Sequence, residues 1–275
     1  MAEPAVSIIV VDNDSHASAR ALVSTPNSRF PIHYAVQPRR GIAFARNTAI
    51  AAAHVADFIA FLDDDEHAAP EWLDELLAVQ RACNAPIVAG PVLPLFEAPP
   101  PLWLVEGGFF HRPRHATGAQ LPSVGSGNVL IAREVLRAMS PAWFDPRFNF
   151  TGGEDTHFFR RAADCGFSIT WANEAIAYEF VPATRVSQQY LVSRARNGAN
   201  HWTRVDLELR PTFTHLAARF GAGVLRVMQG SVAGVLSPAL SPSQKLRGRM
   251  RFAEGLGNLD AFAGRVYNAY GPQDL

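Results

Sequence analysis

The chain has 275 residues, of which 48% are hydrophobic and 18% charged, so it can bury a substantial core and is not a disordered polypeptide. Its 25 Lys and Arg residues balance its 25 Asp and Glu residues, which argues against nucleic acid as the main partner. The two cysteines, Cys83 and Cys165, lack the spacing of a zinc site or a disulfide scaffold. The first residues carry no basic segment ahead of a long apolar one, so we expect no secretory signal and a cytoplasmic protein.

The first part of the chain alternates segments typical of strands with segments typical of helices. The apolar run 5–11 is rich in β-branched residues and predicts a strand buried on both faces. The alternation that follows is that of an α/β protein and predicts a mostly parallel sheet. The further predicted strands cover residues 32–37, 58–62 and 86–90, and the predicted helices cover residues 42–56 and a segment that begins at Pro70.

The middle of the chain has a different composition. Residues 91–110 are rich in proline and aromatic side chains, which predicts a loop. The next predicted elements are a turn, strand and helix over 125–139, a helix over 152–166 and two short strands over 167–181. Beyond this point the pattern turns helical. We therefore predict an α/β domain over residues 1–185 and a helical region over residues 186–275.

Two acidic motifs follow predicted strands. DNDS at 12–15 follows the first strand, and DDDE at 63–66 follows the third. Strands of an open α/β sheet bind ligands at their carboxyl ends, so the two motifs are expected to converge on one crevice. Carboxylate oxygens, together with substrate phosphates, are the ligands that Mg²⁺ and Mn²⁺ prefer. The alternative is a solvated acidic turn, in which Asp65 and Glu66 favour the positive end of the next helix.

Several motifs, taken together and in order, resemble the family 2 glycosyltransferases of the GT-A fold. They run from Val10 to Trp171, and the C-terminal region matches the family only loosely. The motifs are VVDNDS, RRGIAFARN, FLDDDEHAAPEWL, SGNVLIAR and FDPRFNFTGGEDTHFFRRAADCGFSITW. The resemblance implies a Rossmann-like mixed sheet flanked by helices, with an α-helical C-terminal extension.

The resemblance also implies a metal site. Asp63 and Asp65 would form a DXD-type motif that binds Mn²⁺ or Mg²⁺, and the metal would bridge the diphosphate of a nucleotide sugar. Asp64 lies between them, and the sequence leaves open which two of the three acids point inward toward the nucleotide sugar. Relatives often carry a histidine where this chain has Phe180. A metal held mainly by the acids and the phosphates is therefore expected, rather than a site with a third protein ligand.

Further roles follow from the same resemblance. Asp12 or Asp14 would contact the base of the nucleotide, and Arg46 would help to hold the nucleotide. Asp155 would be the general base that deprotonates the acceptor hydroxyl in an inverting transfer, with Glu154 positioning the acceptor. The structural alternatives remain open: Asp155 is then an acid that stabilises a helix N-terminus, and Asp12 is a residue that forms a turn.

The start of the sequence departs from the family pattern. Family members usually begin with a further strand and helix, and that strand lies inside the sheet and lines the nucleotide site. Here only two predicted strands precede residues 58–62. Three explanations stay open: a mis-set start or truncated gene, a rearranged sheet in which the run 5–11 takes the vacant place, or a degraded site. We expect the first, and with it weak binding of UDP-sugars or GDP-sugars by residues 1–275, which calorimetry measures.

The function that the resemblance implies is a metal-dependent, inverting sugar transfer of hexosyltransferase type. The donor would be a nucleotide-diphosphate sugar, and the acceptor a carbohydrate or lipid-linked hydroxyl in polysaccharide or glycolipid biosynthesis of the cell envelope. The alternatives are a nucleotidyltransferase of similar fold and a catalytically degraded interaction protein. The basic segment 245–251 favours peripheral contact with the inner face of an anionic membrane, although a solvated helix face explains it nearly as well.

Overall fold

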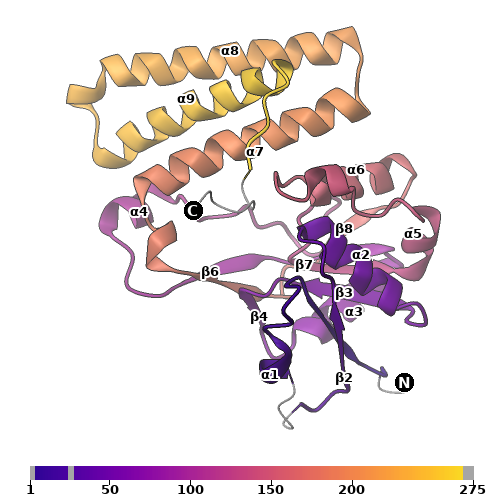
Figure 1. Cartoon of the computed structure of the whole chain (residues 1–275). Helices are drawn as coiled ribbons and strands as arrows, with labels where there is room; N and C mark the ends of the chain where they lie inside the picture. Colours follow the sequence, from indigo (N-terminus) through magenta and orange to yellow (C-terminus); the bar gives the residue numbers. More distant parts are fainter. Residues whose placement is uncertain (1–3, 24–27, 269–275) are drawn as a thin grey trace.

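The computed structural model describes residues 4–23 and 28–268. Strands and short helices form one part of the molecule, and three long helices stack on one side of it (Figure 1). The shorter helices are α1 (Arg20–Val23), α2 (Ile42–Ala52), α3 (Trp72–Cys83), α4 (Leu102–Gly107), α5 (Arg133–Ala138) and α6 (Glu154–Asp164). The long helices are α7 (Gln188–Leu209), α8 (Phe213–Val235) and α9 (Pro242–Phe262). The predicted α/β architecture with a helical C-terminal region is thus confirmed.

The described strands form three sheets. The central sheet has the strand order β3 (Phe58–Leu62), β7 (Asn128–Ala132), β5 (Ile87–Ala89), β8 (Ile169–Trp171). A second sheet has the order β4 (Glu66–Ala68), β9 (Ala177–Val181), β6 (Val92–Phe96). In the third, β1 (Ile8–Asp12) pairs with β2 (Ile32–Val36). β7 runs antiparallel to β3 and to β5, whereas β5 and β8 are parallel. The central sheet is therefore mixed, and the prediction of a mostly parallel sheet is wrong for it. The long connection over residues 97–127 lets β7 enter between β3 and β5 in the opposite direction.

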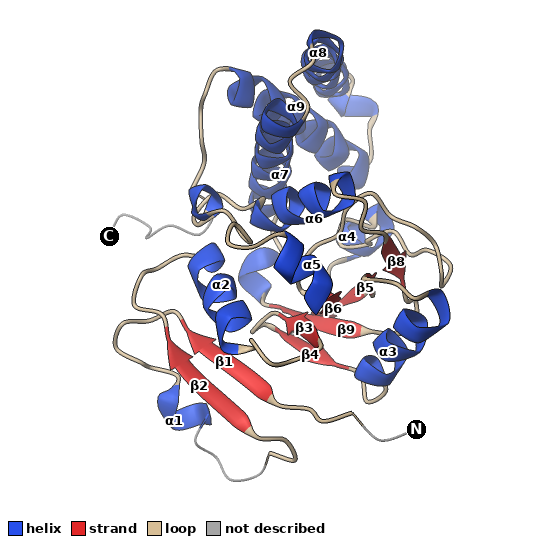
Figure 2. Cartoon of the chain, turned by 90° about the vertical axis from the view of Figure 1, so that its right-hand side faces the viewer, coloured by secondary structure: helices blue, strands red, loops and turns tan. Residues whose placement is uncertain are grey.

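The first strand also differs from its prediction. β1 pairs in parallel with β2 along its whole length. Within the described residues no ladder joins this pair to β3, so the run 5–11 does not take a place beside residues 58–62. Figure 2 shows β1 and β2 as a separate pair of strands. Ile8 is 38% exposed and the apolar residues after it are half-buried, so the predicted burial on both faces is wrong.

The segment 91–110 is not the predicted loop, because it contains β6 and α4. Pro94 lies within β6, which is an edge strand of its sheet, and an edge position tolerates the missing backbone N–H. Pro101 precedes α4 with a φ of −64°, which its ring imposes. Proline content therefore misled the prediction at both elements.

The core lies on both faces of the central sheet. Val129 and Ile131 of β7 are fully buried against α2, α5 and α6 on one face, together with Phe158 of α6. Leu130 points to the opposite face, where it packs with Leu76 of α3. This alternation along β7 is the two-residue period of a strand covered by helices on both sides.

The C-terminal helices are seated on the α/β part by a separate apolar cluster. Leu191 of α7 and Leu246 of α9 are buried there with Leu104 of α4 and Val181 of β9. Arg196 of α7 also donates to Asp260 of α9, at 2.6 Å from its Nη2, and so ties two of the long helices together. Of the helices that the structure describes, none is long and apolar enough to cross a membrane.

Candidate active site

Asn149 fixes the start of α2 from a distant part of the chain. Its Oδ1 accepts hydrogen bonds from the backbone N–H groups of Ala43, at 3.0 Å, and Phe44, at 3.2 Å. These N–H groups of the first helical turn have no partner within the helix, so the amide acts as a cap. Gly41 has a φ of 140°, and a Cβ there would lie 2.3 Å from Asn149 Cγ. The close approach therefore requires glycine at this position.

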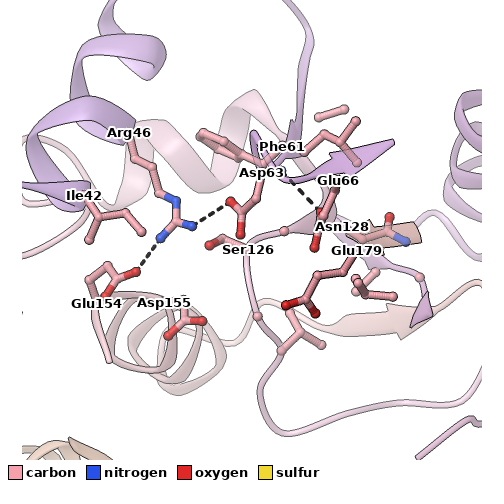
Figure 3. A pocket seen from close by; sticks show the side chains of 18 of the residues that line it. Ile42, Arg46, Phe61, Asp63, Glu66, Ser126, Asn128, Glu154, Asp155 and Glu179 are labelled. Atoms are coloured by element: carbon pink, nitrogen blue, oxygen red, sulfur yellow. Dashed lines mark hydrogen bonds and ion pairs between the residues drawn. The ribbon is translucent and has the colours of Figure 1, made fainter. Parts of the chain in front are cut away.

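Arg46 is the centre of the candidate site. The next residue, Asn47, donates to the carbonyl of Phe144 at 2.8 Å and accepts from its N–H at 3.0 Å, which holds this turn of α2 in place. The Arg46 side chain is buried, and it donates from Nη2 to Asp63 Oδ1 at 2.9 Å and from Nη1 to Glu154 Oε1. Figure 3 shows the guanidinium between the two carboxylates. Arg46 thus joins the acids after β3 to the acids of α6.

The start of α6 is built on two glycines with left-handed backbone. Gly152 has a φ of 73° and Gly153 a φ of 98°, conformations that residues with a side chain rarely adopt. The turn places Glu154 and Asp155 in the first turn of the helix. Asp155 Oδ1 accepts from the N–H of Thr156 at 2.6 Å. Negative charge is favoured at this end of a helix, so the position suits an ionised carboxylate.

The GSGN segment runs between the two groups of acids. A Cβ at Gly125 would lie 3.5 Å from Asp155 Oδ2. A Cβ at Gly127 would lie 2.5 Å from Glu66 Oε1 and 3.0 Å from Asp63 Oδ2. The glycines therefore let the backbone pass close to carboxylates on both sides. Glu66 Oε2 also accepts from the N–H of Asp63 at 3.2 Å, which closes the turn after β3.

The three aspartates after β3 have different surroundings. Asp64 is exposed, whereas Asp63 and Asp65 are half-buried. Asp65 Oδ2 accepts from Arg185 Nη1 at 2.8 Å, and its backbone carbonyl accepts from the N–H of Phe180 at 2.8 Å. The Phe180 side chain is 43% exposed and carries no metal-binding atom. The structure therefore places Phe180 beside the acidic turn, where it adds no ligand.

The acids at this turn are of the type that binds Mg²⁺ or Mn²⁺, although in the part of the chain that the structure describes no three of them have ligand atoms within 4.8 Å of one another. Asp63, Asp65 and Glu66 offer only carboxylate oxygens, the hard ligands that these ions prefer. Gly127 leaves the space beside Asp63 Oδ2 and the Glu66 carboxylate clear of a side chain. The cations that now neutralise the turn are Arg46 and Arg185, which pair with Asp63 and Asp65 respectively.

The acids after β1 lie at a second part of the site. Asp12 accepts hydrogen bonds from the Tyr34 hydroxyl, at 2.6 Å, and from the backbone of Asp14, at 2.9 Å. The Tyr34 hydrogen bond is the main cause that holds the pKa of Asp12 below its usual value. Asn13 accepts from the N–H of Gly41 at 2.7 Å and donates to the carbonyl of Gln37 at 2.8 Å. DNDS therefore also organises the loop between β2 and α2, in addition to forming a turn.

The sequence-predicted residues lie along one large cleft, which also reaches β1, α7 and α9, so lining it does not by itself place two residues close together. Direct contacts join Arg46 to Asp63 and to Glu154. The cleft has a volume of about 3840 Å³ and is lined by all of the predicted acids except Asp14, and by Arg46. Arg46 uses two of its nitrogens for carboxylates, so its contact with a nucleotide stays a prediction. Ser126 Oγ and Glu154 Oε2 are buried without a hydrogen-bond partner, and both belong to residues that line this cleft.

Several functional candidates escaped the sequence reasoning. Glu66 ends the DDDE motif and Ser126 lies in the GSGN segment, but neither residue was assigned a functional role from the sequence. Arg185 and His201 come from the C-terminal side of the chain, where no motif marks them. His201 of α7 packs on the turn before α6, because a Cβ at Gly153 would lie 3.1 Å from the His201 Cβ. The helical region therefore contributes to the candidate site.

A second group of possible metal ligands lies outside the predicted motifs. In the described part of the chain, one ligand atom each of Asp145, His157 and Glu208 lie within 4.8 Å of one another. Arg147 Nη2 donates to both carboxylates, at 2.5 Å to Asp145 and 2.6 Å to Glu208. The Arg147 guanidinium neutralises both acids in the structure, so the group forms an ion-pair network.

Burial shifts two carboxyl groups of the site strongly. Burial, with the charge of Asp155 as the second cause, raises the pKa of Glu154 to about 7. Burial, with the charge of Asp63 as the second cause, raises the pKa of Glu66 to about 7. Burial lowers the pKa of His201, so the imidazole beside Gly153 is neutral at pH 7. The cleft thus contains two carboxyl groups whose pKa is raised, Glu154 and Glu66, and one whose pKa is lowered, Asp12.

The shift at Glu154 predicts a pH dependence of stability. Its pKa is higher in the folded chain, at about 7, than the ordinary value of 4.5, so the folded chain retains the proton between these values. The unfolding free energy then falls as the pH rises through this interval, with a slope of at most about 1.4 kcal/mol per pH unit. We expect Glu154→Gln to remove the part of the slope that Glu154 causes and to leave the part caused by Glu66, whose pKa is also raised to about 7. Urea unfolding of both proteins between pH 4 and 8 measures the slope, with exposed Glu106→Gln as a control that should leave it unchanged.

Comparisons with known proteins identify the family of the chain. The family model described as glycosyl transferase family 2 matches residues 2–139. The succinoglycan biosynthesis protein ExoM of Rhizobium meliloti (strain 1021) is 36% identical over 204 residues. That match covers 70% of this chain and 63% of ExoM, so the chain spans less than two thirds of its curated relative.

A solved structure shows the same fold at low sequence identity. A structure of GalNAc-T7 with UDP, GalNAc and Mn²⁺ superimposes with a TM-score of 0.55 at 15% identity, covering 91% of this chain and 49% of that one. S. aureus TarS 1–349 with UDP has a TM-score of 0.48 at 14% identity, covering 94% of this chain and 82% of that one. On the family match, the chain belongs to glycosyltransferase family 2, and its fold is that of the GT-A glycosyltransferases.

Proposed function

We propose that the chain is a metal-dependent, inverting glycosyltransferase that takes its sugar from a nucleotide-diphosphate sugar. The observation that carries this proposal is the Arg46 bridge, which joins Asp63 of the acidic turn to Glu154 of α6. The bridge connects the acidic turn, whose carboxylates are suited to a metal, with the start of α6, where Asp155 is suited to act as the base. The name of the relative ExoM supports a place in polysaccharide biosynthesis.

The proposed reaction is a single displacement. Asp155 accepts the proton of the acceptor hydroxyl, whose oxygen forms the new bond to the anomeric carbon of the sugar. The bond from that carbon to the diphosphate oxygen breaks, and its electron pair leaves with the nucleoside diphosphate. One displacement at the anomeric carbon inverts its configuration. Glu154 lies beside the base, where its buried carboxyl group positions the acceptor.

The donor side of the cleft belongs to the acids that follow β1 and β3. Asp63 and Asp65, with Asp64 beside them, would hold Mn²⁺ or Mg²⁺, which stabilises the charge that develops on the leaving diphosphate. Asp12 or Asp14 would contact the nucleotide base. The acceptor that we propose is a carbohydrate or lipid-linked hydroxyl, which the chain meets as a peripheral protein at the inner face of a membrane.

Metal dependence gives the direct test of this function. We expect a panel of UDP-sugars and GDP-sugars to yield nucleoside diphosphate in the presence of Mn²⁺ or Mg²⁺, and none after chelation with EDTA. Neutralising the turn in an Asp63→Asn, Asp65→Asn double variant should lower the rate at least about 100-fold, because the leaving diphosphate loses its counter-charge.

A control variant removes the same number of negative charges at positions away from the acidic turn. The double variant Glu106→Gln, Glu134→Gln removes two exposed carboxylates that do not line the cleft and should release nucleoside diphosphate at the unsubstituted rate. Release that survives EDTA, or that persists in the Asp63→Asn, Asp65→Asn protein, contradicts the proposed role of the metal.

A further inference from the structure

α8 has an exposed face that is apolar where a solvent-facing helix is normally charged. The large hydrophobic residues on it recur three or four positions apart and therefore share one side of the helix. The side chains of this α8 apolar face are Phe213, Phe220, Val224, Leu225, Met228, Val232 and Val235, each at least 37% exposed. Contiguous apolar surface of this kind marks an interaction site.

Much of α8 is left uncovered because the side that faces α9 makes only a narrow contact. Gly223 and Gly230 are the buried residues of α8, and they face α9. A Cβ at Gly230 would lie 2.5 Å from Phe252, and one at Gly223 would lie 3.1 Å from Asn258. α8 therefore packs on α9 through a narrow strip of small residues. Figure 1 shows α8 as the outermost helix, with α7 and α9 between it and the sheets.

The segment that leads through α8 into α9 is basic in sequence, and four of its arginines pair with acids of the surrounding helices: Arg210 with Asp164, Arg219 with Asp206, and Arg226 and Arg251 with Glu254. Between Glu208 and Glu254 the sequence contains no Asp or Glu, although the whole chain is neutral. The same interval holds seven basic residues, which are Arg210, Arg219, Arg226, Lys245, Arg247, Arg249 and Arg251. Among the described residues, no acid forms an ion pair with Lys245, Arg247 or Arg249, and all three are exposed. Lys245 and Arg249 form the basic flank of α9, whereas Arg247 donates to the carbonyl of Gly107 at 2.8 Å and lies over the ring of Phe109.

From these observations we propose that the α8 apolar face lies on an anionic lipid bilayer. Apolar side chains on one side of a helix enter the boundary between headgroups and acyl chains, while basic residues beside them attract anionic lipids. A second copy of the chain fits less well, because pairing two such faces would bring two copies of the basic flank together. This assignment names the surface for the membrane contact that the proposed function includes and so rests on that part of it, while vesicle binding and sugar transfer are measured separately and can fail separately.

Sedimentation with vesicles tests the proposal on the full chain, without any nucleotide sugar. We expect binding to vesicles of phosphatidylcholine mixed with phosphatidylglycerol, little binding to phosphatidylcholine alone, and weaker binding as salt is raised. Leu225→Asp with Met228→Asp should weaken the partition at least about tenfold, because two buried apolar groups become charged in the interface. Val55→Asp with Leu102→Asp adds the same charge at two exposed apolar positions elsewhere and should bind normally.

A second pair of variants tests the basic flank separately. Lys245→Glu with Arg249→Glu should also weaken the partition at least about tenfold. The matched variant Arg81→Glu, Arg137→Glu reverses two exposed charges on α3 and α5 and should bind like the unsubstituted chain. Equal binding to neutral and anionic vesicles, or equal loss in test and control pairs, overturns the proposal. A concentration-dependent dimer that Met228→Asp abolishes, without vesicle binding, would overturn it in favour of a second copy.

Discussion

We expect Arg46→Met to lower the unfolding free energy of the chain by about 3–5 kcal/mol, because it leaves a buried carboxylate without its cation. Arg46 is 8% exposed and Glu154 is 4% exposed, and the guanidinium donates to Glu154 Oε1 and to Asp63 Oδ1. Methionine matches much of the arginine volume, so most of the loss comes from the charge. Urea unfolding at pH 8, above the pKa of about 7 that Glu154 has in the unsubstituted chain, measures the loss from a state in which the ion pair is charged.

A double-mutant cycle identifies the source of the loss. In the Arg46→Met, Glu154→Gln protein the unpaired charge is gone, so we expect part of the stability to return. Arg81→Met, at an exposed position of α3, should change stability by no more than about 0.5 kcal/mol. An Arg46→Met protein less than about 1 kcal/mol below the unsubstituted chain would show that the bridge is not the structural centre of the site.

Much of the fold could be predicted from local pattern, because most of its strands are apolar runs that end in turn residues. Residues 58–62 and 86–90 became β3 and β5 in this way. β4 was missed, since its three residues Glu66–Ala68 carry no strand pattern and owe their conformation to pairing with β9. β6 was missed because Pro94 argues against a strand, and only the position of β6 at a sheet edge makes the proline acceptable.

The site was predictable where one motif holds both the residue and its structural cause. The acids after β3 and the pair after Gly153 are such cases, since a strand end and a glycine turn place them. The bridge by Arg46 was not predictable, because its partner Glu154 is 108 positions away. The cap that Asn149 places on α2 likewise acts across 106 positions. Contacts of this kind depend on how the elements pack, which no local pattern contains.

We expect Asp155→Asn to lower the rate of sugar transfer to an acceptor by about 10²–10⁴-fold, the usual contribution of a general base. The rate is measured as the release of nucleoside diphosphate in the presence of the acceptor. The amide keeps an oxygen that can accept from the N–H of Thr156, at 2.6 Å in the structure, so the turn at α6 should be preserved. It cannot take a proton from the acceptor hydroxyl. Affinity for the donor should therefore change little, which calorimetry with the donor measures beside the rate.

The same variant decides between the two interpretations of Asp155. If this residue is only an acid at a helix N-terminus, Asp155→Asn lowers stability by about 0.3–1 kcal/mol and leaves the rate unchanged. Asp74→Asn is the matched control, because Asp74 is an exposed acid in the first turn of α3 and has no catalytic role in the proposal. We expect it to show the small stability loss without the rate loss. An Asp155→Asn protein that behaves like Asp74→Asn in both measurements would remove Asp155 from the reaction, and with it the single-displacement mechanism as drawn.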